Sequence, residues 1–191
     1  MMRIITGKAR GIKLATLEGE NTRPTSERAK EAVFSMLQFN IEGRSVLDLF
    51  SGSGQMALEA LSRGAASATL VDKSRDAIAV IKDNAQKTRL NESCRIVMAD
   101  YLDFLKRSRG IQFDIVFLDP PYAQGFYLPA IKAMLDNKIL KPTSIIVCES
   151  ADASPFEKDA ELMSNLEIEK QVRYGSVLIT ILRMAAKEER E

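Results

Sequence analysis

From residue 46 onward, short and nearly continuous apolar runs alternate with stretches in which apolar residues recur every three or four positions. Continuous apolar character over a short run is typical of parallel β-strands that are covered on both faces. We therefore predict strands at Val46–Phe50, Ala68–Val71, Arg95–Met98, Asp114–Leu118 and Ser144–Cys148.

The intervening stretches have helical periodicity and lie where crossover helices between parallel strands are required. Ser74 is suited to cap the second of them, because Ile78, Ile81 and Ala85 then share one helical face. The predicted helices are Gln55–Ser62, Ser74–Thr88, Asp103–Arg107 and Tyr127–Asp136.

Two further apolar stretches near the C-terminus, Leu166–Tyr174 and Val177–Met184, are separated by Gly175 and Ser176. A Gly-Ser pair between two β-rich stretches predicts a tight hairpin turn and therefore an antiparallel pair of strands. Five parallel strands, their crossover helices and this hairpin indicate the α/β class. The expected architecture is a doubly wound, mostly parallel, seven-stranded sheet of the Rossmann-like kind.

The segment before the predicted sheet has a different character. Gly7 and Gly11 break Met2–Leu17 into short extended pieces, which predicts a small hairpin, and a helix over Arg28–Gln38 is expected to follow. We therefore divide the chain into an N-terminal hairpin and helix over residues 1–40, a main domain over residues 41–185, and a charged tail over residues 186–191 that is expected to fray.

The length of 191 residues, with 46% hydrophobic and 28% charged residues, fits one globular domain with a small appendage. No window of eighteen residues is free of charge and no signal-peptide pattern is present, so we expect a cytoplasmic protein. The net charge of +1 is unevenly distributed, because residues 1–30 contain seven Lys and Arg against three Glu, whereas the remainder contains 20 against 23. The predicted N-terminal hairpin is therefore basic.

Histidine is absent, which excludes Ser-His-Asp and Cys-His nucleophilic catalysis and removes the commonest metal ligand. The two cysteines, Cys94 and Cys148, lie in predicted strands, and we expect buried thiols rather than a metal site or a disulfide. The chemistry of the protein must then use carboxylates, amides or a cofactor.

A glycine turn follows the first predicted strand, where Gly52 and Gly54 precede the first crossover helix. Backbone amides and close backbone approach at such a turn suit a nucleotide-like ligand. With Ala57 the spacing also satisfies the looser dinucleotide pattern G-x-G-x-x-A. The turn alone leaves three interpretations open: a structural tight turn, a nicotinamide dinucleotide site and an S-adenosylmethionine site.

Three carboxylates at the ends of successive strands favour S-adenosylmethionine. Asp48 precedes the glycine turn, where it could accept a hydrogen bond from the ammonium group of an amino acid, for which a dinucleotide has no counterpart. Asp72 could accept from ribose hydroxyls and Asp100 from an adenine amine, since the carboxyl ends of parallel strands line one crevice. The alternative for Asp72 and Asp100 is that each only caps the helix that follows it.

The fourth predicted strand ends in Asp119-Pro120-Pro121-Tyr122. Two consecutive prolines remove two backbone donors, so this loop presents carbonyl groups. Asp119 and the Pro120 carbonyl could accept both hydrogens of an exocyclic amine, and Tyr122 offers a ring on which a base could stack. Methyl transfer to such an amine depends mainly on positioning and electrostatics, so it needs no histidine. The alternative is a rigid turn whose Tyr packs locally.

This combination resembles the Class I methyltransferases with a [DNS]-P-P-[YFW] loop and, among them, the RsmD-like enzymes that form N2-methylguanine in 16S ribosomal RNA. The resemblance spans nearly the whole chain. It rests on Met2–Gly11, on Thr22–Thr25 with Arg28 and Phe34, on Asp48–Gly54, on Leu58–Ala65 and on Asp119–Tyr122.

The resemblance implies S-adenosylmethionine as the cofactor and catalytic roles for Asp119, Pro120, Pro121 and Tyr122. It implies cofactor binding at the glycine turn and the next two strand ends, to which we add neighbouring residues; the set is Asp48, Ser51, Gly52, Gly54, Asp72, Lys73, Asp100 and Tyr101. The chain departs from the family pattern at Gln55-Met56, where Ala-Leu is usual, and at Asp72, where Glu is usual.

The expected partner is 16S rRNA, within an assembling or complete 30S subunit, and cationic N-terminal residues are expected to contact its phosphates. They are Arg3, Lys8, Arg10, Lys13, Arg23 and Arg28. The choice of guanine N2 comes from the resemblance alone. N6-adenine methylation of DNA or RNA, protein-glutamine methylation, a nicotinamide oxidoreductase and a non-catalytic RNA-binding module remain alternatives.

Overall fold

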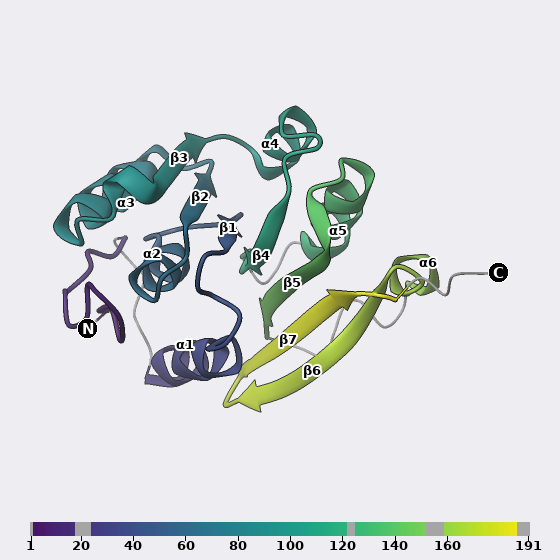
Figure 1. Cartoon of the computed structure of the whole chain (residues 1–191), viewed down its shortest axis with the longest axis horizontal. Coiled ribbons are helices and arrows are strands. Elements are labelled where there is room, and N and C mark those ends of the chain that lie inside the picture. Colours follow the sequence, from purple (N-terminus) through teal and green to yellow (C-terminus); the bar gives the residue numbers. More distant parts are fainter. Residues whose placement is uncertain (1, 18–23, 122–124, 152–158, 187–191) are drawn as a thin grey trace.

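A computed structural model of the chain describes residues 2–17, 24–121, 125–151 and 159–186 (Figure 1). Its helices are α1 (Pro24–Met36), α2 (Gln55–Ser62), α3 (Arg75–Lys87), α4 (Tyr101–Arg107), α5 (Tyr127–Asp136) and α6 (Ala160–Met163), with a short 3-10 helix η1 (Asn91–Ser93). Its strands are β1 (Ser45–Asp48), β2 (Ser67–Asp72), β3 (Cys94–Met98), β4 (Phe113–Leu118), β5 (Leu140–Ser150), β6 (Leu166–Tyr174) and β7 (Val177–Met184).

The seven strands form one sheet with the order β3-β2-β1-β4-β5-β7-β6. The strands β1 to β5 are parallel to one another, whereas β7 is antiparallel to both of its neighbours. Strand order reverses between β1 and β4, because the chain first builds β2 and β3 on one side of β1 and then places β4 on its other side. The predicted α/β class and the doubly wound, seven-stranded sheet are confirmed.

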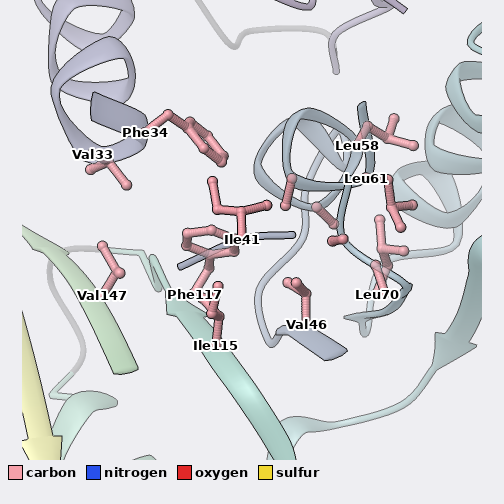
Figure 2. Close-up of a cluster of buried hydrophobic side chains, with 14 of the residues drawn as sticks. Val33, Phe34, Ile41, Val46, Leu58, Leu61, Leu70, Ile115, Phe117 and Val147 are labelled. Carbon is pink, nitrogen blue, oxygen red and sulfur yellow. The ribbon is translucent and has the colours of Figure 1, made fainter. Parts of the chain in front are cut away.

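Helices cover both faces of the sheet, since neighbouring residues of each strand point to opposite sides. Along β1, Val46 packs in the layer that contains α1, α2 and α3, whereas Leu47 packs in the layer of α4, α5 and α6 (Figure 1). Figure 2 shows side chains of the first layer, among them Phe34 from α1, Leu61 from α2 and Phe117 from β4. The ring centroids of Phe34 and Phe117 are 5.7 Å apart.

Four elements have the bounds that the sequence predicts: α2, α5, β6 and β7. The hydroxyl of Ser74 accepts a hydrogen bond from the amide of Ala77, which confirms it as the cap of α3. Helix α4 begins earlier than predicted because Asp100 caps it. Of the helices in the described ranges, none is long and apolar enough to cross a membrane.

Other bounds differ from the prediction. Strand β1 ends at Asp48 rather than Phe50, because the last sheet-like hydrogen bond to β4 is the one from Leu49 N to Phe117 O, after which the glycine turn begins. Helix α1 begins at Pro24, a residue suited to the first turn of a helix, and ends before Leu37. The sequence did not predict α6 and η1, which are four and three residues long and too short to have a periodicity.

The N-terminal hairpin forms as predicted, although it has a single antiparallel bridge, between Arg3 and Lys13, rather than regular strands. At the end of the hairpin opposite its turn, the amide of Leu14 donates a hydrogen bond to the carbonyl of Met2. Met2, Ile4 and Leu14 are buried in the hydrophobic cluster that also contains side chains of α1, α2 and α3. The division of the chain at residue 40 stays a prediction.

Asp114 in β4 holds three segments together at the amino end of the sheet. Its carboxylate accepts hydrogen bonds from Ser45 N at 2.9 Å, Ser45 Oγ at 2.7 Å and Lys141 Nζ at 2.8 Å, and Arg44 Nη1 lies 3.2 Å away. Burial raises the pKa of Asp114, but the hydrogen bonds from Lys141 and Ser45 outweigh it and hold the pKa well below its ordinary value. The ionised carboxylate therefore stabilises the sheet.

We expect Asp114→Asn to lower the free energy of unfolding at pH 7 by about 2 kcal/mol, because hydrogen bonds to a charged group are lost. The stabilisation from a depressed pKa is fully present above the ordinary Asp pKa of about 4 and is lost gradually as the pH falls from that value towards the lower pKa of the folded state, so the difference from the unsubstituted protein should be smaller at pH 3 than at pH 7. Urea unfolding at pH 7 and pH 3 measures both effects. Asp83→Asn, which alters an exposed pair with Lys87, serves as the control and should change stability by less than about 0.5 kcal/mol.

Candidate active site

The carboxyl ends of β1, β2, β3 and β4 surround a cleft of about 410 Å³ at one edge of the sheet. This volume lies within the range of about 300–1,000 Å³ that is usual for small-ligand sites. Eight of the twelve residues predicted to act in catalysis or to bind the cofactor line this cleft. They are Gly52, Asp72, Lys73, Asp100, Tyr101, Asp119, Pro120 and Pro121.

Asp72, the last residue of β2, links the two turns that border the cleft. Its Oδ2 accepts a hydrogen bond from Gly52 N at 2.9 Å, and its Oδ1 accepts one from Ser74 N at 2.8 Å. Gly52 has a φ of 51°, a left-handed conformation that glycine adopts without steric cost. Each carboxylate oxygen has a second lone pair, so Asp72 can shape the glycine turn and still accept from a ligand hydroxyl.

Three residues predicted to bind the cofactor, Asp48 before the glycine turn and Ser51 and Gly54 within it, are buried and do not line the cleft. Ser51 Oγ donates to the carbonyl oxygen of Asp48 at 2.7 Å. Gly54 has a φ of 78°, and a Cβ at this position would lie 3.0 Å from Leu70 Cδ2. Their contact with a cofactor stays a prediction.

Asp48 is buried, with only 3% of its surface exposed. Burial raises the pKa of Asp48 to about 7, a hydrogen bond from Ala57 N acts in the opposite direction, and the negative charge of Asp72 raises the pKa further. Both protonation states of Asp48 are therefore populated near neutral pH. Within the described part of the chain, no group of three or more acidic or cysteine side chains could hold a metal ion.

Asp100 both caps α4 and lines the cleft. Its Oδ1 accepts a hydrogen bond from Leu102 N at 2.9 Å, which leaves Oδ2 able to accept from a ligand. Beside it, the rings of Phe50, Tyr101 and Phe126 form a cluster with centroid separations of 5.1 to 5.6 Å. The capping role and the predicted ligand-binding role of Asp100 are compatible in this geometry.

The loop after β4 borders the cleft with Asp119, Pro120 and Pro121. Asp119 is exposed and Pro120 is buried, whereas Tyr122 lies outside the described residues. The first residue of α5, Tyr127, donates its hydroxyl to the carbonyl of Glu149 at the end of β5. Burial raises the pKa of Tyr127 and the negative charge of Asp119 raises it further, so this phenol stays a neutral donor beside the loop.

Sequence reasoning missed the rest of the cleft wall, which is mostly apolar. Its residues are Leu17, Leu49, Phe50, Ser74, Ala77, Ala99 and Phe126. Phe50 and Ala99 had a usable signal, because each lies within two residues of the end of a strand on this edge of the sheet. Leu17 and Phe126 had none, since each reaches the cleft from a loop whose path depends on tertiary contacts.

The predicted RNA-binding residues of the hairpin remain on the surface. Arg3, Lys8, Arg10 and Lys13 are exposed, as is Arg28 in α1, and Arg23 lies outside the described residues. The hairpin turn is docked on the last turn of α2, where Lys8 N donates to Ser62 O at 2.9 Å. At Gly7, whose φ is 86°, a Cβ would lie 1.8 Å from that same carbonyl oxygen, so glycine is required for the close approach.

Comparison with known proteins agrees with this geometry. The family model described as conserved hypothetical protein 95 matches residues 2–183. The chain is 37% identical to "Ribosomal RNA small subunit methyltransferase D" of Haemophilus influenzae over 157 residues, which cover 81% of each protein. It is 32% identical to "Putative rRNA methyltransferase YlbH" of Bacillus subtilis over 190 residues, 95% of this chain and 98% of that one.

The solved structure of "Putative methyltransferase yhhF from Escherichia coli" superposes with a TM-score of 0.82 and 31% identity, covering 97% of this chain and 99% of that one. The resemblance to the RsmD-like family is thereby confirmed.

The pKa of Asp48 leads to a test of its environment. A raised pKa stabilises the folded state fully below the ordinary Asp pKa of about 4, and this contribution is lost as the pH rises through about 7. Asp48→Asn has no such titration, so we expect its stability relative to the unsubstituted protein to improve by about 2 kcal/mol between pH 5 and pH 8. Chemical unfolding of both proteins at the two pH values measures this change, and parallel pH profiles would contradict it.

Proposed function

This chain belongs to the conserved hypothetical protein 95 family, and we propose that within it the protein transfers a methyl group from S-adenosylmethionine to the exocyclic N2 of a guanine in 16S ribosomal RNA. The observation that carries the proposal is the single cleft that brings Asp72, Asp100 and the Asp119-Pro120-Pro121 loop together. The relative named as a small-subunit rRNA methyltransferase supports RNA as the substrate.

The residues of the cleft fit S-adenosylmethionine. Asp72 and Asp100 are acceptors for ribose hydroxyls and for an adenine amine, and both have oxygen lone pairs available for them. Leu49, Phe50 and Ala99 provide an apolar surface for the purine and the methylene groups. Asp48, just before the glycine turn, has a pKa of about 7, and its ionised form favours the cationic amino-acid part of the cofactor.

S-adenosylmethionine, when bound, supplies an electrophilic methyl group. The role of the loop after β4 is to orient the attacking amine. Asp119 and the carbonyl of Pro120 accept its two hydrogens, so that the nitrogen lone pair points to the methyl carbon. Pro120 and Pro121 have no N–H groups, so these two positions offer carbonyl acceptors and no backbone donors to the amine. Tyr122 stacks on the target base in this proposal, and the amine proton leaves after the bond has formed.

The exposed cations of the hairpin bind the phosphates of the RNA. A base within a helix must be unstacked before it reaches a cleft of this kind, so a loop or an incompletely assembled region is the favoured target. We propose that the enzyme acts on 16S rRNA within an assembling or complete 30S subunit. Arg3, Lys8, Arg10 and Lys13, with Arg23 and Arg28, are the proposed contacts.

Asp119→Ala should reduce the methyl-transfer rate by about a hundredfold or more, because a group that orients the attacking amine is lost. Its affinity for S-adenosylmethionine should change by less than about threefold, since the proposed cofactor contacts lie on other strands. Single-turnover methylation and calorimetric titration separate the two effects. Asp136→Ala, at the exposed end of α5, is the matched control and should leave both quantities unchanged.

The substrate is identified by incubating 30S subunits and total RNA with methyl-labelled cofactor and analysing the labelled nucleosides. N2-methylguanine in 16S rRNA is the expected product. Labelled N6-methyladenine as the sole product would overturn the guanine assignment, and label in protein alone would overturn the RNA assignment. Binding of NADH without binding of S-adenosylmethionine would favour an oxidoreductase instead.

Replacing both Lys8 and Arg10 by Gln should weaken RNA binding and reduce the slope of log Kd against log salt concentration by roughly 1.5, because each lost phosphate contact removes about 0.7–0.9. The affinity for S-adenosylmethionine should not change. Lys106→Gln with Arg107→Gln, in α4 on the opposite face of the sheet, provides a control of equal charge. An equal loss of RNA affinity in that control would indicate a non-specific charge effect.

A further inference from the structure

We propose that Leu17 is a cofactor-binding residue and that Asn84 positions it, so that the N-terminal basic segment completes the wall of the cofactor cleft. The proposal rests on the proposed function, because it assigns a part of the same S-adenosylmethionine site. It is carried by the position of Leu17 at the cleft and by the hydrogen bonds of the buried Asn84 side chain.

Leu17 reaches the cleft from outside the sheet domain. The other lining residues follow the ends of β1, β2, β3 and β4 or lie at the start of α3 and α5, whereas Leu17 continues directly from the basic hairpin. The side chain of Leu17 is half-buried. The residues that connect the hairpin to Leu17 form neither a strand nor a helix. A segment without secondary structure needs specific contacts to hold one side chain at a cleft.

Asn84 in α3 supplies those contacts. Its side chain is fully buried, and its amide pairs with the backbone of Ala15 in both directions: Ala15 N donates to Oδ1 at 2.8 Å, and Nδ2 donates to Ala15 O at 3.0 Å. The same Nδ2 donates to the carbonyl of Ser53 in the glycine turn at 2.9 Å. One side chain therefore fixes the segment two residues before Leu17 to α3 and to the turn that follows β1.

A second contact fixes the hairpin to the same turn. Ser53 Oγ, which is buried, lies within hydrogen-bonding distance of Met2 Sδ at 3.2 Å. Both ends of the hairpin therefore meet the glycine turn, one through Met2 and the other through Ala15 and Asn84. The hydrogen bonds of Asn84 and Ser53 therefore hold Leu17 in place beside Gly52 and Asp72, although Leu17 lies outside any helix or strand.

This arrangement predicts that Leu17→Ala weakens S-adenosylmethionine binding by about fivefold, as expected when part of the apolar contact of a Leu is removed. Thr16→Ala is the matched control, since Thr16 is the exposed neighbour and does not line the cleft. Calorimetric titration with S-adenosylmethionine measures the affinities of the unsubstituted protein and of both variants. Equal melting temperatures of the three proteins verify that the substitutions leave the fold intact. Equal affinity of Leu17→Ala and Thr16→Ala would overturn the proposal.

The role of Asn84 is tested by a double-mutant cycle. Asn84→Ser should weaken cofactor binding by about fivefold in the unsubstituted protein and by less than about twofold when Leu17 is already Ala, because Asn84 acts through Leu17. A purely structural role would give the same loss in both backgrounds and would overturn the positioning role. If Asn84→Ser does not fold, the comparison of Leu17→Ala with Thr16→Ala still decides whether Leu17 binds the cofactor.

The unsubstituted protein separates this proposal from the proposed function. If it binds no S-adenosylmethionine, the proposed function fails and this inference fails with it. If it binds S-adenosylmethionine with an affinity that Leu17→Ala leaves unchanged, only this inference is overturned. We expect Leu17→Ala to weaken S-adenosylmethionine binding and Thr16→Ala to leave it unchanged. We also expect the effects of Leu17→Ala and Asn84→Ser to be non-additive.

Discussion

A fully buried carboxylate, that of Glu59 in α2, joins the N-terminal segment to the rest of the protein. It accepts hydrogen bonds from the amides of Ile5 and Thr6 at 2.7 and 3.0 Å and from Arg63 Nε at 2.7 Å, and Lys30 Nζ of α1 lies 3.6 Å away. A charge without solvent is stable only when its lone pairs are satisfied in this way. The hairpin, α1 and α2 are therefore fixed together, and the position of the hairpin beside the cleft depends on this network.

The sequence predicted the parts of the fold whose information is local. Helices α2 and α5 have clear periodicity, and the β6–β7 turn contains Gly175 with a φ of 59°, so these bounds were correct. The hairpin has one bridge because its backbone bonds to Glu59 and Ser62 instead of to a long partner strand. The carboxylate of Glu59, which accepts from Ile5 and Thr6, lies 54 and 53 residues further along the chain. Such distant contacts leave no local sequence pattern, so the irregular form of the hairpin could not be predicted.

The same distinction applies to the site. Asp72, Asp100 and Asp119 were predicted because each follows a parallel strand, and the carboxyl ends of parallel strands meet at one edge. Leu17 could not be predicted, since it lies at the cleft only through a contact between Ala15 and Asn84, which are 69 residues apart. Apolar lining residues that do not follow a strand end, such as Leu17 and Phe126, have no signature that separates them from core residues, and only the folded chain identifies them.

The hydrogen-bonding character of the cleft also limits the ligands that it accepts. Burial raises the pKa of Asp48 to about 7 against a hydrogen bond from Ala57 N, and the negative charge of Asp72 contributes to the rise, so a positive charge beside Asp48 would favour its ionised form. A sulfonium and an ammonium group supply positive charge, whereas the phosphates of a dinucleotide would add negative charge. After Asp119, the two prolines provide backbone carbonyls and lack the N–H groups that other residues would provide. Within this largely apolar wall, the carboxylates of Asp72, Asp100 and Asp119 are acceptors that favour donor-rich and cationic ligands, and they can do so without acting as an acid or base.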